Sequence, residues 1–301
     1  MQVTNPEQLF ELKENEFIGE LPTLTNSQIN FNGINNILVC EEGVNLWNSR
    51  IDFNLDNSIL YLSSDTHNYS VNISLHNDNI CFIGKNNFFN GMTVFVLSES
   101  KNIFLGDDCF ISYNVVFRTS DGHPIYNAES KRRENFAKSI YVGDHVWLGQ
   151  NAFIFKGSKI GSGAVIGAGS VVSNKTINSN TTYAGAPLKL IKDNSFWIPH
   201  SVHGWSEEDI SKMSVYNSEL FVYDVDDSTL NFDRIENDLN SFSELDDVVS
   251  YIWSTIIVGG KNIGSFGVVG PQRMDYSLIA SALKFVSNEL ENLDKIEDKR
   301  S

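Results

Sequence analysis

The chain has 301 residues, of which 41% are apolar and 20% charged, and a formal net charge of −16. A single core usually stops growing at about 250–300 residues, so this length predicts two structural units. No run approaches the ~18 uninterrupted apolar residues of a membrane helix, and the N-terminus lacks the basic start and apolar run of a secretory signal. We therefore expect a cytoplasmic protein with no membrane span.

The cysteines give the same indication about the compartment. Cys40, Cys81 and Cys109 are odd in number, far apart and free of any Cys-x-x-Cys spacing. This pattern argues against a disulfide framework and against a zinc site. A reducing cytoplasm fits best, and no metal is expected.

Charge is distributed unevenly along the chain. Residues 196–301 hold 19 acidic and 8 basic residues, a net of −11, which leaves −5 for residues 1–195. Within 118–195 the sign reverses, because ten basic residues stand against five acidic ones. A basic island of this kind favours phosphorylated or carboxylated ligands. Nucleic acid is not expected as a partner, because the chain has no nucleic-acid-binding motif and its overall charge would repel a polyanion.

The first part of the chain shows only weak regularity. We treat residues 1–30 as a separate N-terminal segment. Beyond them, short β-rich runs such as I-N-N-I-L-V-C and T-V-F-V-L are separated by Asn and Asp, which predicts irregular coils of a solenoid.

A six-residue period dominates the middle of the chain and decides the predicted fold. Aliphatic residues recur at an interval of six, Gly often follows them, and small or β-branched residues stand four places further on. The aliphatic positions are Val142, Leu148, Ile154, Ile160, Ile166 and Val172, and the small positions are Val146, Ala152, Ser158, Ala164, Ser170 and Thr176. Three such hexads form one triangular coil, and stacked coils bury a continuous column. The fold class is therefore mainly β, a left-handed parallel β-helix over residues 31–195.

One long insertion interrupts this register. Residues 118–141 contain Asp121-Gly122-His123-Pro124 and the basic run Lys131-Arg132-Arg133. Insertions into a solenoid often form its binding face. We interpret this segment as an active-site loop.

Beyond residue 196 the composition predicts an acidic, mainly helical extension over 196–301. Ser206-Glu207-Glu208-Asp209 is typical of a helix start, and Ser243 to Val258 is interpreted as an apolar helix that ends at Gly259-Gly260. An apolar stripe over residues 277–293 predicts an amphipathic helix that packs on a core or, alternatively, between subunits. Residues 264–290 resemble the closing segment of the heat-inducible transcription repressor family, without that family's DNA-binding part.

With the hexads, D-G-H-P-I-Y, V-G-D-H-V-W-L-G and A-G-A-P-L-K-L-I-K in view, residues 103–192 resemble the hexapeptide-repeat acyltransferases. The interval of 24 residues from His123 to Trp147 is most similar to bacterial capsular polysialic acid O-acetyltransferases. The resemblance implies transfer of acetyl from acetyl-CoA to a glycan hydroxyl. It also implies a homotrimer with its sites between subunits.

The same resemblance suggests roles for individual residues. His123 would be the general base that the transfer requires, and Trp147 would line the acceptor or acetyl site unless it fills an inward position of a coil. Backbone N–H groups of Gly149 and Gln150 would stabilise the oxyanion. The acceptor would contact Asn114, whose alternative role is an asparagine ladder. Independently of the resemblance, the basic run of the loop suggests Arg132 and Arg133 as contacts to an acidic acceptor. His145 is interpreted as a turn residue without a catalytic role.

Coenzyme A is long and multiply negative, so its binding is expected to combine backbone amides with lysines. The residues that match family positions for this purpose are Ala168, Gly169, Lys175, Lys189 and Lys192. Lys binds phosphate as a point charge and not as a fork.

Three functions remain open on the sequence alone. The first is O-acetylation of an acidic glycan such as a sialic acid polymer, which the basic island favours. The second is acetylation of a neutral sugar or xenobiotic, as in the maltose, galactoside and chloramphenicol type of enzyme. The third is a non-catalytic solenoid scaffold, for which the repeat alone would suffice.

Overall fold

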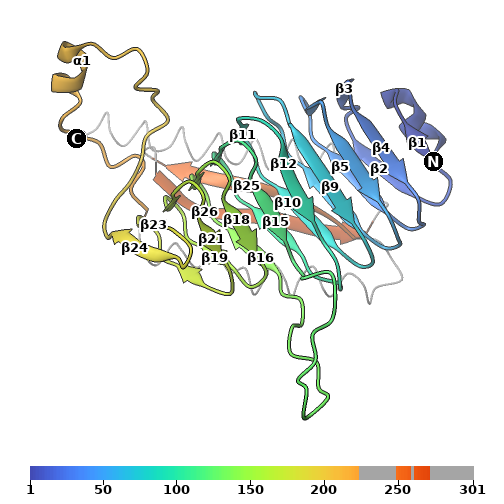
Figure 1. The fold of residues 1–301 in the computed structure, drawn as a ribbon. Coiled ribbons are helices and arrows are strands. Elements are labelled where there is room, and N and C mark those ends of the chain that lie inside the picture. The colour runs from blue at the N-terminus through green and yellow to red at the C-terminus, as the bar shows by residue number, and fades with distance from the viewer. Residues whose placement is uncertain (224–248, 259–260, 272–301) are drawn as a thin grey trace. The chain divides into compact units, whose positions relative to one another are not determined.

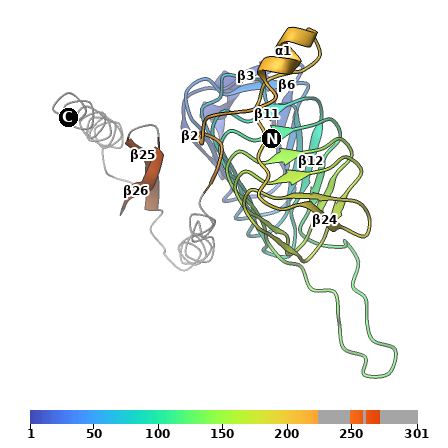
Figure 2. The same cartoon turned by 90° about the vertical axis from the view of Figure 1, so that its left-hand side faces the viewer.

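A computed structural model describes residues 1–223, 249–258 and 261–271, the last two ranges by their backbone alone. Residues 1–217 and 221–230 form one unit, and residues 218–220 and 231–301 form another. In the first unit, short strands of successive coils lie side by side and build a triangular β-solenoid (Figure 1, Figure 2). The predicted parallel β-helix is confirmed.

Each face of the solenoid is one sheet. The first face has eight strands, parallel except at β1: β1 (Gln2–Val3), β4 (Gln28–Phe31), β7 (Arg50–Phe53), β9 (Val71–Leu75), β12 (Thr93–Val96), β15 (Val116–Arg118), β18 (Phe153–Phe155) and β21 (Val171–Val172). The second face is parallel throughout: β2 (Glu16–Gly19), β5 (Ile37–Cys40), β8 (Ile59–Leu62), β10 (Ile80–Ile83), β13 (Ile103–Leu105), β16 (Ile140–Val142), β19 (Lys159–Ile160) and β22 (Thr176–Ile177).

The third face is shorter and closes with an antiparallel pair. Its strands are β11 (Phe88–Phe89), β14 (Phe110–Ile111), β17 (Trp147–Leu148), β20 (Val165–Ile166), β23 (Thr182–Ala184) and β24 (Lys189–Lys192). A separate parallel pair, β3 (Thr23–Thr25) and β6 (Asn45–Trp47), lies among the first coils. The described helices are the 3-10 helix η1 (Pro6–Glu11) and α1 (Glu207–Lys212).

An apolar column fills the solenoid. On the first face, Ile29, Ile51, Ile73, Phe95 and Phe117 stand in register at successive offsets of 22 residues, and all are buried. The rings of Phe95 and Phe117 stack with centroids 4.7 Å apart. Burial of such side chains stabilises the fold by about 1.5–3 kcal/mol each. In the later coils, the aliphatic residues of the predicted hexads are buried in the same column.

Left-handed corners turn the chain from one face to the next. Asn35 and Asn57 occupy one such corner in successive coils, with positive φ, and Asn57 donates a side-chain hydrogen bond to Asp78 over 3.0 Å. Asn and Asp tolerate this backbone conformation better than other non-Gly residues. The Asn and Asp that separate the β-rich runs therefore mark the corners.

The solenoid differs from the predictions at its start and near its end. The solenoid begins before residue 31, because β2 and β4 already pair in parallel with β5 and β7. Near the other end of the solenoid the six-residue period is shortened by one residue. Ile177 is paired with Ile160 of the preceding coil and is buried, whereas Thr176, predicted to occupy a small inward position, is exposed.

The C-terminal predictions have a mixed outcome. A helix start at Ser206 is confirmed, because its hydroxyl accepts the Asp209 N–H and caps α1. The helix predicted over 243–258 is wrong where the structure describes it, since Val249–Val258 is strand β25, which pairs antiparallel with β26 (Lys261–Pro271). Its β-branched residues and following Gly-Gly fit a hairpin as well as a helix end. The helix predicted over 277–293 lies outside the described residues.

Candidate active site

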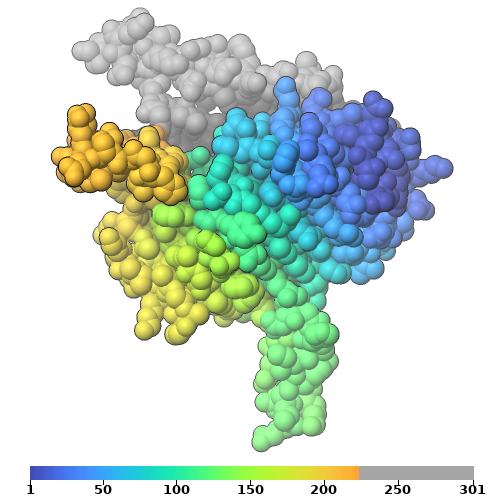
Figure 3. Space-filling model, turned by 45° about the horizontal axis from the view of Figure 1, so that its top comes forward, coloured from blue at the N-terminus to red at the C-terminus, as the bar shows by residue number. Residues whose placement is uncertain are grey.

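The predicted loop leaves the solenoid between β15 and β16 and projects from it (Figure 1, Figure 3). Two ion pairs fix its root: Lys156 lies 2.5 Å from the Asp121 carboxylate, and Arg133 lies 2.7 Å from that of Glu99. Hydrogen bonds from these cations lower the pKa of both carboxyl groups, with smaller contributions from their charges. The loop root is therefore tied to the solenoid by charged side chains.

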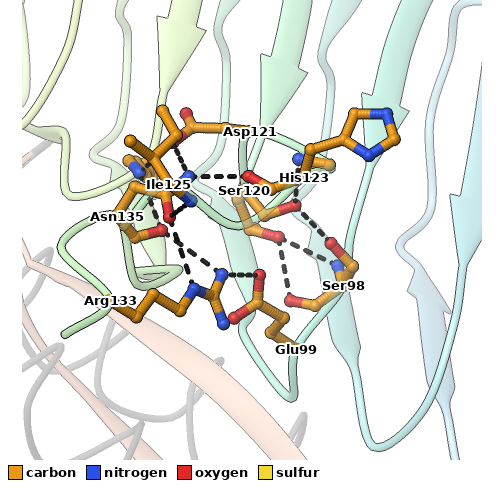
Figure 4. Close-up of polar contacts among 11 residues, drawn as sticks. Ser98, Glu99, Ser120, Asp121, His123, Ile125, Arg133 and Asn135 are labelled. Carbon is orange, nitrogen blue, oxygen red and sulfur yellow. Dashed lines mark hydrogen bonds and ion pairs between the residues drawn. The ribbon is translucent and has the colours of Figure 1, made fainter. Parts of the chain in front are cut away.

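His123 lies in a turn close to this root. Its side chain is exposed and makes no hydrogen bond within the described residues, whereas its backbone carbonyl accepts a 2.8 Å hydrogen bond from Asn135. Figure 4 shows the imidazole pointing away from the polar cluster that holds the backbone. An exposed imidazole with a free ring nitrogen is available to accept a proton from a ligand.

A second part of the candidate site is a shallow depression of about 410 Å³ beside the third face. Trp147 stands in it with 40% of its surface exposed, and the neighbouring Leu148 fills the inward position. The Trp147 indole N–H donates to the Ser112 hydroxyl over 3.2 Å, and its ring meets Phe110 edge to face. Trp147 therefore does not fill the column, and an aromatic surface is open to a ligand.

A tight turn, Gly149 to Ala152, borders the depression. The Ala152 N–H donates to the Gly149 carbonyl over 3.1 Å, and Asn151 has a φ of 57°. The Gly149 N–H is already donated to the Ile166 carbonyl at 2.7 Å. That corrects the expectation that Gly149 serves as an oxyanion donor. The Gln150 N–H, in contrast, has no acceptor within the described residues.

The two parts of the candidate site lie at different corners of the solenoid. The depression lies where the third face turns into the first, at residues 112 and 150, whereas the His123 loop leaves where the first face turns into the second. His123 does not line the depression. A single chain therefore presents the imidazole and the aromatic surface separately.

A solved structure of the polySia-specific acetyltransferase NeuO is similar to this chain. The two share 32% sequence identity over 66% of this chain and 93% of that one, with a TM-score of 0.57. This chain belongs to the hexapeptide-repeat acyltransferase family. A non-catalytic scaffold is thereby set aside.

A second solved structure is similar to this acyltransferase. The polysialic acid O-acetyltransferase OatWY shares 26% identity over 67% of this chain and 99% of its own, with a TM-score of 0.47. No family model matches the chain. Among the described residues there is no helix long and apolar enough to cross a membrane.

A short match confirms the C-terminal resemblance to the repressor family. The heat-inducible transcription repressor HrcA of Thermoanaerobacter pseudethanolicus (strain ATCC 33223 / 39E) is 39% identical over 54 residues, which are 18% of this chain and 16% of the repressor. The acyltransferase thus spans under a fifth of the length of the curated relatives that it matches. No regulatory function follows from so short a match.

The predicted acceptor residues of the acyltransferase do not gather in the depression. Asn114 has positive φ at a corner and donates its side-chain amide to Asn151 over 2.9 Å, which is the ladder contact that its alternative interpretation requires. Arg133 is engaged with Glu99. Arg132 is exposed on the loop.

The predicted cofactor residues divide into two groups. Ala168 lines the depression, and beside Gly169, which has a φ of 66°, there is open space. Lys189 and Lys192 are exposed on β24. Lys175, in contrast, donates to the Leu188 carbonyl over 3.3 Å and lies over the ring of Tyr183.

His145 has a structural role that the sequence does not reveal. It occupies a left-handed corner, as predicted, but is fully buried, and its Nδ1 lies 2.8 Å from Asp108. The ring stacks between Trp197 and Phe221, at 4.1 and 4.4 Å. It thereby fastens the segment after the solenoid. Asp108 lies 37 residues earlier in the chain and Trp197 52 residues later, so no local pattern indicates this burial.

The three cysteines take no part in the candidate site. All are free and buried in the column, and burial raises the pKa of each thiol above its ordinary value. A buried protonated thiol is a poor nucleophile. The three thiols are therefore poor candidates for a catalytic nucleophile.

Proposed function

We propose that this acyltransferase is an acetyl-CoA-dependent O-acetyltransferase that modifies a hydroxyl of an acidic glycan of the sialic acid polymer class. The similarity to NeuO, over 93% of that polySia-specific enzyme, is the observation that carries the proposal. The exposed imidazole, the exposed indole and the unpaired amide described above fit such a transfer.

Charge near the loop supports an acidic acceptor. Several bases of the island have internal partners: Lys156 and Arg133 hold the loop root, and Lys138 donates to Asn174. The side chains of Arg118 and Arg132 are exposed, and their guanidinium groups form no hydrogen bond or ion pair within the described part of the chain. Guanidinium groups bind carboxylates in a bidentate manner, so these two are the proposed contacts to the acceptor. Arg133, which is paired with Glu99, would act on the acceptor only through its long-range positive charge.

The proposed chemistry is a direct transfer. His123 removes the proton of the acceptor hydroxyl as its oxygen attacks the thioester carbonyl, and the Gln150 N–H donates to the oxyanion that forms. The carbon–sulfur bond then breaks, and the proton held by His123 passes to the departing thiolate. Trp147 would bound the space in which acceptor and acetyl group meet.

Assembly would bring the two parts together. Because one chain presents His123 and the depression at different corners, we propose a homotrimer in which the loop of one copy reaches the depression of the next. The co-substrate would lie along Ala168 and Gly169, with its phosphates near Lys189 and Lys192. Lys175 would need to leave Tyr183 to take part.

An acceptor panel tests the proposed function. The full-length protein is incubated with acetyl-CoA and polysialic acid, sialic acid monomer, maltose, a galactoside or chloramphenicol, and release of free thiol is followed. We expect turnover with the acidic glycan well above turnover with neutral acceptors. Turnover of neutral acceptors alone would contradict the acidic-glycan assignment and favour the maltose and galactoside type of activity.

A further inference from the structure

One side-chain amide spans the turn that carries His123. Asn135, on the returning arm of the loop, donates from Nδ2 to the His123 carbonyl over 2.8 Å, and its Oδ1 accepts the Ile125 N–H over 2.7 Å (Figure 4). The same Nδ2 donates to the Asp121 carboxylate over 2.8 Å. Both sides of Pro124 are thus held by a single residue.

The sequence of the turn explains why a side chain is needed there. Pro124 has no N–H and cannot donate to a neighbouring backbone. Further out, the two arms pair through their backbones: the Glu134 N–H donates to the Ile125 carbonyl, and the Asn127 N–H to the Arg132 carbonyl. Closer to the solenoid, the side-chain amide of Asn135 makes the next contact between the two arms, by donating to the His123 carbonyl.

Asn135 is itself fixed from two directions. Lys156, from the turn after β18, donates to the Asn135 carbonyl over 3.2 Å while it pairs with Asp121. Arg133 donates to the Asn135 Oδ1 over 3.3 Å while it pairs with Glu99. The amide therefore fixes the backbone of residue 123 relative to the solenoid, while the imidazole forms no hydrogen bond within the described residues.

We propose that Asn135 is the positioning residue for His123, holding the backbone of the general base in one conformation while its ring stays free to reach the acceptor. This inference rests on the proposed role of His123 as base. A group that is misplaced by about 1 Å can lower a rate by about 10²-fold, so loss of the Asn135 contacts should reduce kcat more than binding.

The test compares Asn135→Asp with Asn127→Asp, a matched control in the same loop. The first substitution replaces the donor to His123 by an oxygen. The second keeps the acceptor for Glu129 and Ser130 and replaces the contact to Glu134 by a like-charge pair, much as the first does toward Asp121. We expect Asn135→Asp to lower kcat by about 10- to 100-fold with KM for acetyl-CoA within about twofold. Asn127→Asp should keep kcat within about twofold of wild type.

An exchange of the side chains at positions 121 and 135 separates the positioning of His123 from the general stability of the loop. The double variant Asp121→Asn, Asn135→Asp restores a donor and an acceptor between residues 121 and 135 but not the donor to the His123 carbonyl. We expect its thermal unfolding midpoint to return only part of the way toward wild type, because the charge that pairs with Lys156 is lost, while kcat stays low. Recovery of kcat together with stability would overturn the positioning role, as would a wild-type kcat in Asn135→Asp.

His123→Ala, assayed in parallel, distinguishes the inference from the function on which it rests. An inactive His123→Ala beside a fully active Asn135→Asp overturns the positioning alone. If His123→Ala is as active as wild type, the base role fails and the positioning role fails with it.

Discussion

The indole Nε1 of Trp147 donates a 3.2 Å hydrogen bond to the hydroxyl of Ser112, which lies one coil earlier in the corner that follows the third face. This contact, with the edge-to-face packing against Phe110, fixes an aromatic plane that is still 40% exposed. An aromatic side chain held in place at a surface in this way offers a rigid apolar face that a ligand can contact.

Removal of this plane should weaken acceptor binding. We expect Trp147→Ala to raise KM for the acceptor by about tenfold, since a positioned aromatic contact is worth about 0.5–1.5 kcal/mol beyond its buried area. Steady-state kinetics of thiol release measure this. Ser112→Ala, which only releases the indole, should have a smaller effect, and an unchanged KM in Trp147→Ala would remove the indole from the acceptor site.

The turn beside Trp147 allows a direct test of the oxyanion donor. Gln150 has negative φ and Asn151 positive φ, with the Ala152 N–H bonded to Gly149, which is the type II pattern. Proline is favoured at the position of Gln150 in such a turn. Gln150→Pro therefore removes the free N–H without breaking an internal hydrogen bond.

We expect Gln150→Pro to fold normally and to lose about 10²–10³-fold in kcat, the usual cost of one oxyanion donor. Gln150→Ala, which keeps the amide, is the control and should retain most activity. Circular dichroism and thermal unfolding check the fold. A Gln150→Pro enzyme with wild-type kcat would show that the oxyanion is stabilised elsewhere.

The exposed lysines of β24 should act on the co-substrate. We expect Lys189→Ala with Lys192→Ala to raise KM for acetyl-CoA about fivefold and to leave kcat nearly unchanged, in the ~1 kcal/mol range of exposed charge pairs. The effect should shrink at high salt because exposed charges are screened. Lys212→Ala, which removes the exposed Lys212–Glu208 pair of α1, is the control. Equal KM values in all variants would exclude the β24 lysines from binding.

Asp144 should make stability depend on pH. Burial raises the pKa of its carboxyl from 3.8 to about 6, and the nearby charge of Asp107 adds to the effect. Between about pH 4 and 6 the folded state holds a proton that the unfolded state has released, so stability falls as pH rises through this window and stays lower above it. Two pKa units correspond to about 3 kcal/mol.

We expect Asp144→Asn to unfold at a higher temperature than wild type at pH 7–8 and at a similar temperature near pH 4. Asn can still accept the Asp107 N–H, which bonds to Asp144 Oδ1 over 2.8 Å. The pKa of the Asp107 carboxyl is also raised by burial, so a residual slope should remain in both proteins. A variant that is destabilised equally at all pH values would show that the carboxylate contributes a contact and not a buried charge.

The sequence predicts the later coils well because their inward residues recur every six positions. The earlier coils follow a different rule: Ile29, Ile51 and Ile73 align at 22 residues. That longer repeat is present in the sequence at an offset of 22, but it breaks the six-residue phase because the corners between faces are longer. The solenoid therefore begins earlier than the predicted residue 31.

The candidate site likewise has features that the sequence predicts and features that it does not. The sequence locates His123 in an insertion, because the insertion interrupts a regular pattern. The contacts of Asn135, and the prior use of the Gly149 N–H in the ladder, depend on the path of the folded chain and have no local pattern. The same holds for the helix predicted near residue 250, where a β-branched run before Gly-Gly suits a hairpin equally well.

The base role of His123 is tested most directly by the initial rate of thiol release from acetyl-CoA with polysialic acid, measured for wild type and His123→Ala at equal folded concentration. Loss of a general base costs about 10²–10⁴-fold. We expect turnover by the wild-type enzyme and a fall of that size in the variant, with an unchanged unfolding temperature. An equal rate in both proteins would contradict the account.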